Sequence, residues 1–123
     1  MLVRTLLAAA ALAACSSYAL AGDVVGEWAR DDGKAKVRFA PCGAAVCGRV
    51  TWLRDPTGPA KVGQQVFFDM KPSGENVWAG TAFNPDDGQN YTGKMTMSGD
   101  SLITAGCVFG GWICKSVAWT KSK

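Results

Sequence analysis

The sequence predicts a small antiparallel all-β domain of about eight strands that follows an N-terminal export signal. Turn signals recur at fairly even spacing, and apolar and polar residues alternate in several segments between them, which is typical of a sandwich or a barrel. No segment after the N-terminal run has a helical period. Glycines inside the strands permit sharp coiling and so favour closure into an up-and-down barrel. The seven turn signals are residues 31–33, 41–43, 55–58, 71–74, 84–88, 98–100 and 110–111, and the interior glycines are Gly48, Gly80, Gly93 and Gly106.

Residues 1–21 have the organisation of a signal peptide, which leaves residues 22–123 as the folded domain. Arg4 supplies the positive charge, residues 6–14 form a short apolar run, and Ala19 and Ala21 are the small residues before a cleavage site. The run is too short to span a bilayer, which takes about 20 apolar residues. We therefore expect export and a periplasmic location.

A second interpretation of the same segment stays open. Residues 12–15 resemble a bacterial lipobox, in which Cys15 would be acylated and become the mature N-terminus. Only in that case would we expect the membrane to be a partner. Both interpretations place the domain outside the inner membrane.

Four cysteines remain in the domain: Cys42, Cys47, Cys107 and Cys114. An even number of cysteines in an exported chain predicts two disulfides, and three pairings are open. We favour Cys42–Cys47 and Cys107–Cys114, because each closes a short loop. A zinc site is the alternative, but paired CxxC knuckles are absent and the compartment is oxidising, so no metal is expected.

The first strands alternate clearly. Ala35, Val37 and Phe39 are expected to face inward, with cations between them facing solvent. In the following strand one face is formed by Val46, Gly48, Val50 and Trp52.

The later strands are less regular. In residues 65–70, one face is predicted to carry Val66, Phe68 and Met70, and the other Gln65, Phe67 and Asp69. Residues 77–83 are apolar on both faces, as in a strand that is covered on both sides or borders a site. Residues 112–120 do not alternate cleanly, because Lys115 shares a face with Ile113, Val117 and Trp119.

A turn at residues 84–88 is the centre of the predicted hairpin. Pro85 presets the backbone for a type I turn, Asn84, Asp86 and Asp87 bond to nearby backbone, and Gly88 takes the positive φ that closes it. The strand after it has one apolar face, which is formed by Tyr91, Gly93, Met95 and Met97.

The strongest chemical statement is an exclusion. The chain contains no histidine, so Ser-His-Asp and Cys-His catalysis and His-ligated metal sites are excluded. It has no P-loop and no GxGxxG motif, and no cofactor is expected. The domain has 12 basic and 10 acidic residues, and the basic ones are scattered, which is untypical of a nucleic-acid surface.

Carboxylates are the remaining candidates for acid–base chemistry. A hydrolase using Asp86 or Asp87, or a calcium site formed with Asn84, would use the central turn. Adjacent residues in a turn rarely approach one substrate from two sides, and turns favour Asp for backbone reasons alone. We therefore expect a structural turn with no catalytic residue.

A ligand pocket is the sharper interpretation of the aromatic residues. Trp52, Trp78, Tyr91 and Met95 are candidates to bind a small apolar ligand at one barrel end. The simpler interpretation is that the five tryptophans fill the core, because an eight-stranded barrel has room only for its own side chains or one small ligand.

Several segments resemble one family. Gly26-x-Trp28, the CG…CGR segment at residues 42–50, the PDDGxxY turn at residues 85–91, and Trp119-Thr120 are similar to the bacterial domain of unknown function 2147. The resemblance implies a lipocalin-like, calycin-type barrel and no established activity. Gly26-x-Trp28 also resembles the start of a lipocalin, which implies that Trp28 closes one barrel end beneath a cation supplied by Lys121.

Three functions follow as hypotheses. The first is an exported, non-enzymatic binding module for a small apolar ligand. The second is an envelope protein-interaction or inhibitor domain that acts through its loops around a filled barrel. The third is a carboxylate-based hydrolase.

Overall fold

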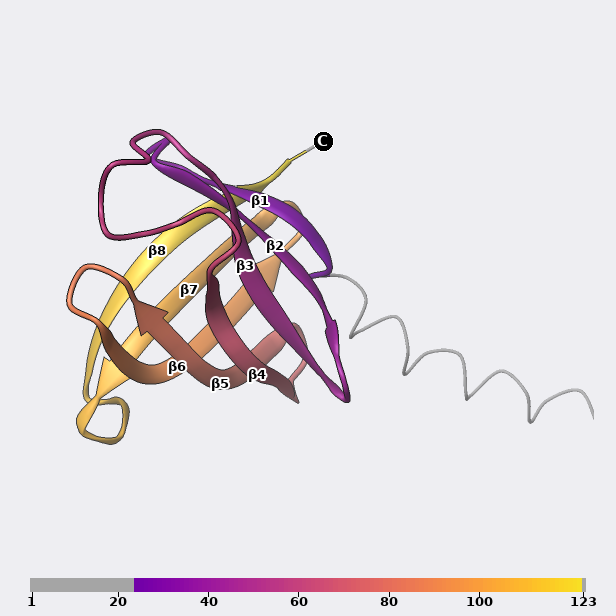
Figure 1. Cartoon of the computed structure of the whole chain (residues 1–123). Coiled ribbons are helices and arrows are strands. Elements are labelled where there is room, and N and C mark those ends of the chain that lie inside the picture. Colours follow the sequence, from indigo (N-terminus) through magenta and orange to yellow (C-terminus); the bar gives the residue numbers. More distant parts are fainter. Residues whose placement is uncertain (1–23, 123) are drawn as a thin grey trace, which may run out of the picture.

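The computed structural model describes residues 24–122, so the predicted signal peptide and Cys15 lie outside the described residues. Eight antiparallel strands form one closed barrel in which each strand pairs with the next and β1 pairs with β8 (Figure 1). The prediction of a closed all-β barrel is confirmed. The strands are β1 Gly26–Arg30, β2 Ala35–Cys42, β3 Ala45–Leu53, β4 Gln65–Gly74, β5 Val77–Asn84, β6 Gln89–Ser98, β7 Ser101–Val108 and β8 Ile113–Lys121, with a 3₁₀ turn at Phe109–Gly111.

The up-and-down order gives the barrel two different ends. The open end carries the β1–β2, β3–β4, β5–β6 and β7–β8 connections, and the closed end carries the other three and the start of β1. Within residues 24–122 no helix is long and apolar enough to cross a bilayer. One predicted turn is wrong: residues 71–74 continue β4, and the reversal falls at Glu75 and Asn76, where Asn76 takes a φ of 57°.

Trp28 plugs the closed end. Its side chain is fully buried, and its Nε1 donates a hydrogen bond of 2.9 Å to the carbonyl oxygen of Val24. The Nζ of Lys121 lies 5.3 Å from the Trp28 ring centroid and donates to the carbonyl oxygen of Val25. A cation over an indole face is an attractive arrangement. The structure therefore has the geometry that the lipocalin resemblance implies for Trp28 and Lys121.

Large side chains fill the rest of this end. Met70, Trp78, Met95 and Leu102 are each at most 2% exposed and belong to one apolar cluster. Above them, Phe39 and Phe67 pack with ring centroids 5.2 Å apart, on either side of Gly48. A Cβ at Gly48 would lie 2.8 Å from the Phe39 ring, so the missing side chain makes room for both rings.

The predicted inward position of Trp52 is wrong. A bulge between Lys36 and Val37 pairs Val37 with Val50 and Lys36 with Trp52, so β3 has one more residue than β2 over this stretch. An extra residue reverses the faces that follow it. Trp52 therefore lies on the outer wall, 43% exposed and 5.9 Å from the Lys36 Nζ, and Leu53 turns inward.

A second irregularity changes β4. Phe67, predicted to share a face with Gln65 and Asp69, is buried in the core, whereas Phe68, predicted to lie on the opposite face, is only half-buried. The register shifts between Phe68 and Lys71, where Asp69 takes a φ of 50°, and Met70 is returned to the interior. Gly80 of β5 makes this possible, since a Cβ there would lie 2.5 Å from the Asp69 carbonyl oxygen.

The two buried indoles at the closed end give a matched test of stability. Trp28→Phe removes a donor and leaves the buried Val24 carbonyl without that bond, whereas no described residue accepts a bond from the buried Nε1 of Trp78. Leaving a buried polar group unpaired costs about 1–3 kcal/mol. We expect Trp28→Phe to lower the free energy of unfolding by that much more than Trp78→Phe, measured by denaturant titration. Equal losses would contradict this assignment of the two donors.

Candidate functional site

The open half of the barrel interior contains a cavity of about 700 Å³. Ligand pockets for small molecules have volumes of about 300–1,000 Å³, so the space suits one such ligand. The inner part of its wall is predominantly apolar and comes from five strands, β2, β3, β4, β5 and β8. The inner side chains are Val37, Val50, Leu53, Val66, Phe67, Ala82, Phe83, Val117 and Trp119.

Trp119 marks the boundary between the cavity and the packed core. It is 5% exposed, and its Nε1 donates a hydrogen bond of 2.9 Å to the Oγ1 of Thr104, which is also buried. The Arg30 guanidinium lies 5.9 Å from the Trp119 ring centroid. The one polar pair in this inner region is thus internally satisfied, and the remaining wall offers apolar contact.

Charged side chains surround the mouth. Arg30, Lys34, Arg54 and Lys115 border it together with Asp55, Asp86 and Asp87. Several of these are already engaged: Arg30 forms a salt bridge of 3.0 Å with Asp32, and Asp55 accepts bonds from the hydroxyl and amide of Thr57. Those bonds from Thr57 lower the pKa of Asp55, so its carboxylate stays ionised at neutral pH.

Lys115 explains the irregular pattern of the last strand. It lies on the same face of β8 as Val117 and Trp119, but its position near the start of the strand places it at the cavity mouth. A lysine can lay its apolar stem along such a wall and keep the ammonium in water. Within residues 24–122 we find no ion pair of Lys115.

The β5–β6 turn is held by its own side chains. Asn84 Oδ1 accepts a bond from the Asp86 amide, and Asp87 Oδ1 accepts one from the Gln89 amide. The Tyr91 hydroxyl donates a short hydrogen bond to the other Asp87 oxygen. Gly88 takes a φ of 70°, as the turn requires. Both Asp87 oxygens therefore act in the turn, which favours the structural interpretation over catalysis or calcium binding.

The four residues predicted to bind a ligand are not brought together. Tyr91 borders the cavity. Trp78 and Met95 lie in the packed core of the closed end, and Trp52 lies on the outer wall. Sequence reasoning missed three residues that border the cavity: Phe67, Trp119 and Lys115. The broken alternation at Lys115 is the signal that could have indicated a residue at the cavity mouth.

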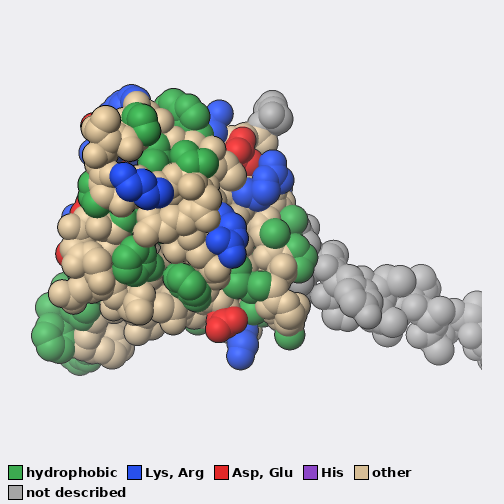
Figure 2. Space-filling model, viewed as in Figure 1, with side chains coloured by type: hydrophobic (Ala, Val, Ile, Leu, Met, Phe, Trp, Pro, Cys, Tyr) green, Lys and Arg blue, Asp and Glu red, His purple; other side chains and the backbone are tan. Residues whose placement is uncertain are grey.

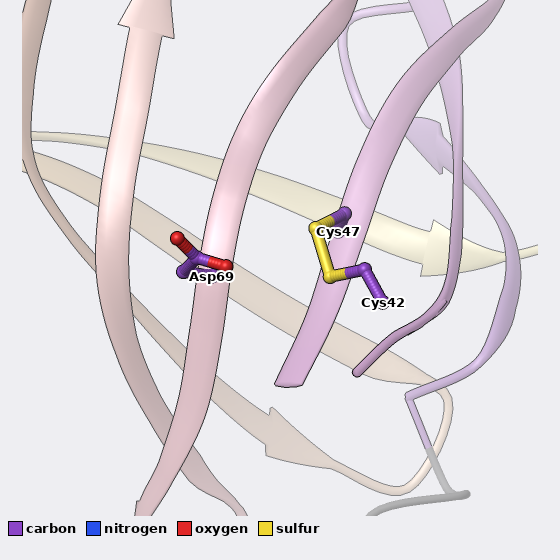
Figure 3. A group of neighbouring side chains, drawn as sticks. All are labelled: Cys42, Cys47 and Asp69. Carbon is purple, nitrogen blue, oxygen red and sulfur yellow. A yellow bond between two sulfur atoms is a disulfide. The ribbon is translucent and has the colours of Figure 1, made fainter. Parts of the chain in front are cut away.

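The cysteines form the two disulfides favoured from the sequence, Cys42–Cys47 and Cys107–Cys114. The Asp69 carboxylate lies near the first of these, within 4.8 Å of both sulfurs (Figure 3). Sulfurs bonded to each other are not thiolate ligands, so this group does not form a metal site in the oxidised protein.

Comparison with known proteins supports the family and the fold. The family model described as "Uncharacterized protein conserved in bacteria (DUF2147)" matches residues 26–121. No curated protein matches the chain. Among solved structures, protein HP1028 from the human pathogen Helicobacter pylori, described as belonging to the lipocalin family, superposes with a TM-score of 0.65 at 16% identity. The match covers 82% of this chain and 84% of that chain, and it shows a shared lipocalin-like fold.

Tyr91 offers a direct test of the turn geometry. The hydrogen bond to Asp87 raises the pKa of Tyr91, as do partial burial and the charge of Asp87, because all three disfavour the phenolate. Residues 22–123 contain no other tyrosine, so phenolate absorbance reports Tyr91 alone. We expect its midpoint above the ordinary value near 10, and lower in Asp87→Asn. The folded form binds the proton more tightly, so this stabilisation is present below the ordinary pKa and lost as pH rises through the raised one.

Asp86→Asn is the matched control for this titration. It removes an adjacent charge without removing the bond to Tyr91, so the midpoint should stay near that of the unmodified protein. If the two variants shift the midpoint equally, the hydrogen bond is not the cause.

Proposed function

The chain belongs to the DUF2147 family, and we propose that it is a non-enzymatic binding module whose barrel takes up a small amphiphilic ligand through its open end. The observation that carries the proposal is the cavity of about 700 Å³ with an apolar wall and a lysine at its mouth. The lipocalin-like fold is consistent with a binding role.

The apolar part of the ligand would lie against the inner wall. Phe67 and Trp119 offer large ring surfaces there, and Val50 and Val117 offer branched side chains. Contact with such surfaces releases water from both partners, at about 25 cal/mol per Å² of apolar area removed from water. A tail of moderate length therefore suits this wall better than a polar metabolite does.

Lys115 favours an acidic head group on that ligand. Its ammonium is at the mouth on the same face as Val117 and Trp119, so a head group would reach it while the tail lies inside. The acidic residues nearby are partly engaged, Asp87 by Tyr91 and Asp55 by Thr57. A charge-assisted hydrogen bond to a carboxylate or phosphate is stronger than a neutral one.

Two disulfides in a small domain indicate an oxidising environment, and we propose the periplasm as the place of action. Cleavage after Ala21 would release the module, and acylation of Cys15 would tether it to the envelope. No catalytic group is part of the proposal, because the side chains of the β5–β6 turn support that turn.

A charge reversal tests the head-group role. Lys115→Glu should weaken binding of dodecanoate about tenfold, since one charge-assisted bond is lost and a repulsive charge is added. It should leave dodecanol binding nearly unchanged, because the alcohol has the same tail and no charge. The measurement is titration followed by tryptophan fluorescence and calorimetry.

Lys94→Glu is the control, because Lys94 is an exposed residue of β6 that does not border the cavity. If neither dodecanoate nor dodecanol binds the unmodified protein, and no ligand co-purifies in native mass spectrometry, the binding function is wrong. If Lys115→Glu weakens both ligands equally, the cavity binds tails but Lys115 does not choose the head group.

A further inference from the structure

The connection between β7 and β8 carries the two most exposed large apolar side chains of residues 24–122, and the first residue of β8 adds a third that is mostly exposed. Phe109 is 76% exposed, Trp112 88% and Ile113 60%, and we call these three residues the aromatic tip. Figure 2 shows hydrophobic side chains gathered at the lower left, where Figure 1 places this connection. We propose that the aromatic tip inserts into the surface of a phospholipid bilayer.

The tip is held in one shape before it meets any partner. The Cys107–Cys114 disulfide clips the two strands beside it, and the amide of Trp112 donates to the carbonyl oxygen of Phe109. Phe109, Gly110 and Gly111 all have positive φ, which is uncommon for a bulky residue such as Phe. Because the loop is already ordered, its insertion into a bilayer does not carry the entropic cost of ordering it.

The tip also projects from the barrel wall. The β7–β8 ladder continues to Val108 and Ile113, whereas β1 pairs with β8 no further than Trp119 and β6 pairs with β7 no further than Cys107. The tip is therefore a convex apolar wedge rather than a flat face or a groove. A fluid bilayer accepts such a wedge, whereas a folded partner would need a matching pocket.

The charge of the hairpin fits a lipid surface. Residues 101–120 contain one charged side chain, Lys115, and no acidic one. Tryptophan prefers the membrane interface, where its ring is apolar and its N–H stays hydrated, and a nearby lysine is attracted to anionic head groups. Acidic residues lie at the same barrel end: Asp31 and Asp32 after β1, Asp55 on the β3–β4 connection, and Asp86 and Asp87 on the β5–β6 turn. Their charge would keep the contact with the bilayer shallow.

This docking would orient the barrel. The aromatic tip and the cavity mouth lie at the same end, so a bilayer that holds the tip also faces the mouth. The inference does not rest on the proposed ligand, because the exposed tip and its charge are independent of what fills the cavity. It also needs no lipid on Cys15.

Vesicle binding of the exported protein tests the proposal. The protein is produced with Cys15→Ser in its precursor, so that acylation cannot contribute, and is mixed with vesicles of phosphatidylcholine and phosphatidylglycerol in equal parts. We expect co-sedimentation with the vesicles, and quenching of tryptophan fluorescence by brominated lipid that is lost in Trp112→Phe. Phe109→Ser with Trp112→Ser should lower the partition coefficient at least tenfold.

Val62→Ser is the matched control, since Val62 is an apolar residue of the β3–β4 connection at the same end and is 61% exposed. Its partition coefficient should not change. Melting temperatures establish that each variant is folded, and Trp112→Ser alone serves if the double variant is not.

Three outcomes would overturn the proposal. The first is that the unmodified protein fails to bind the vesicles. The second is that Val62→Ser loses as much binding as the tip variant. The third is self-association in sedimentation velocity that depends on Trp112 without vesicle binding, which would assign the tip to a second copy of the chain.

Discussion

Closure between β1 and β8 is the constraint on which the rest of this structure depends. Only three residue pairs join the two strands, and they include Trp28 with Lys121 and Arg30 with Trp119. The same pairs bring a cation over each of the two indoles, at the closed end and beside the cavity. Bonds at both ends of this seam reinforce it, from Thr120 to Asp31 and from the Ser122 amide to Glu27. A short first strand thus completes the barrel and removes its edges.

Once eight strands close, the interior volume is nearly set, and side-chain size decides how it is used. The closed end receives Trp28, Trp78, Met70 and Met95, and is filled. At the open end, valines, alanines and a glycine lie between the larger side chains of Phe67, Phe83 and Trp119, and a cavity remains. The cavity is therefore a consequence of where the bulky residues fall along strands of similar length.

The same closure separates two apolar surfaces with different uses. The cavity wall is concave and lies between strands, whereas the aromatic tip is convex and lies beyond the last pairs of β8 with β1. Both occur at the open end, because the β7–β8 connection is one of the four on that side. The same end of the barrel would therefore serve both proposed roles, the uptake of an amphiphile and the contact with a lipid surface.

The sequence by itself determined the β class, the strand number and the favoured disulfide partners, because turn residues, alternation and short loops act between near neighbours. The family resemblance correctly indicated a lipocalin-like barrel. Only the tertiary structure decided which side chains face inward where strands are irregular. One extra residue in β3 sent Trp52 to the outer wall, and Phe67 is buried in the core where the β3–β4 register shifts beside Gly48. Such bulges depend on pairing and on close backbone approach between separate strands, as at Gly80, and no local pattern contains that information.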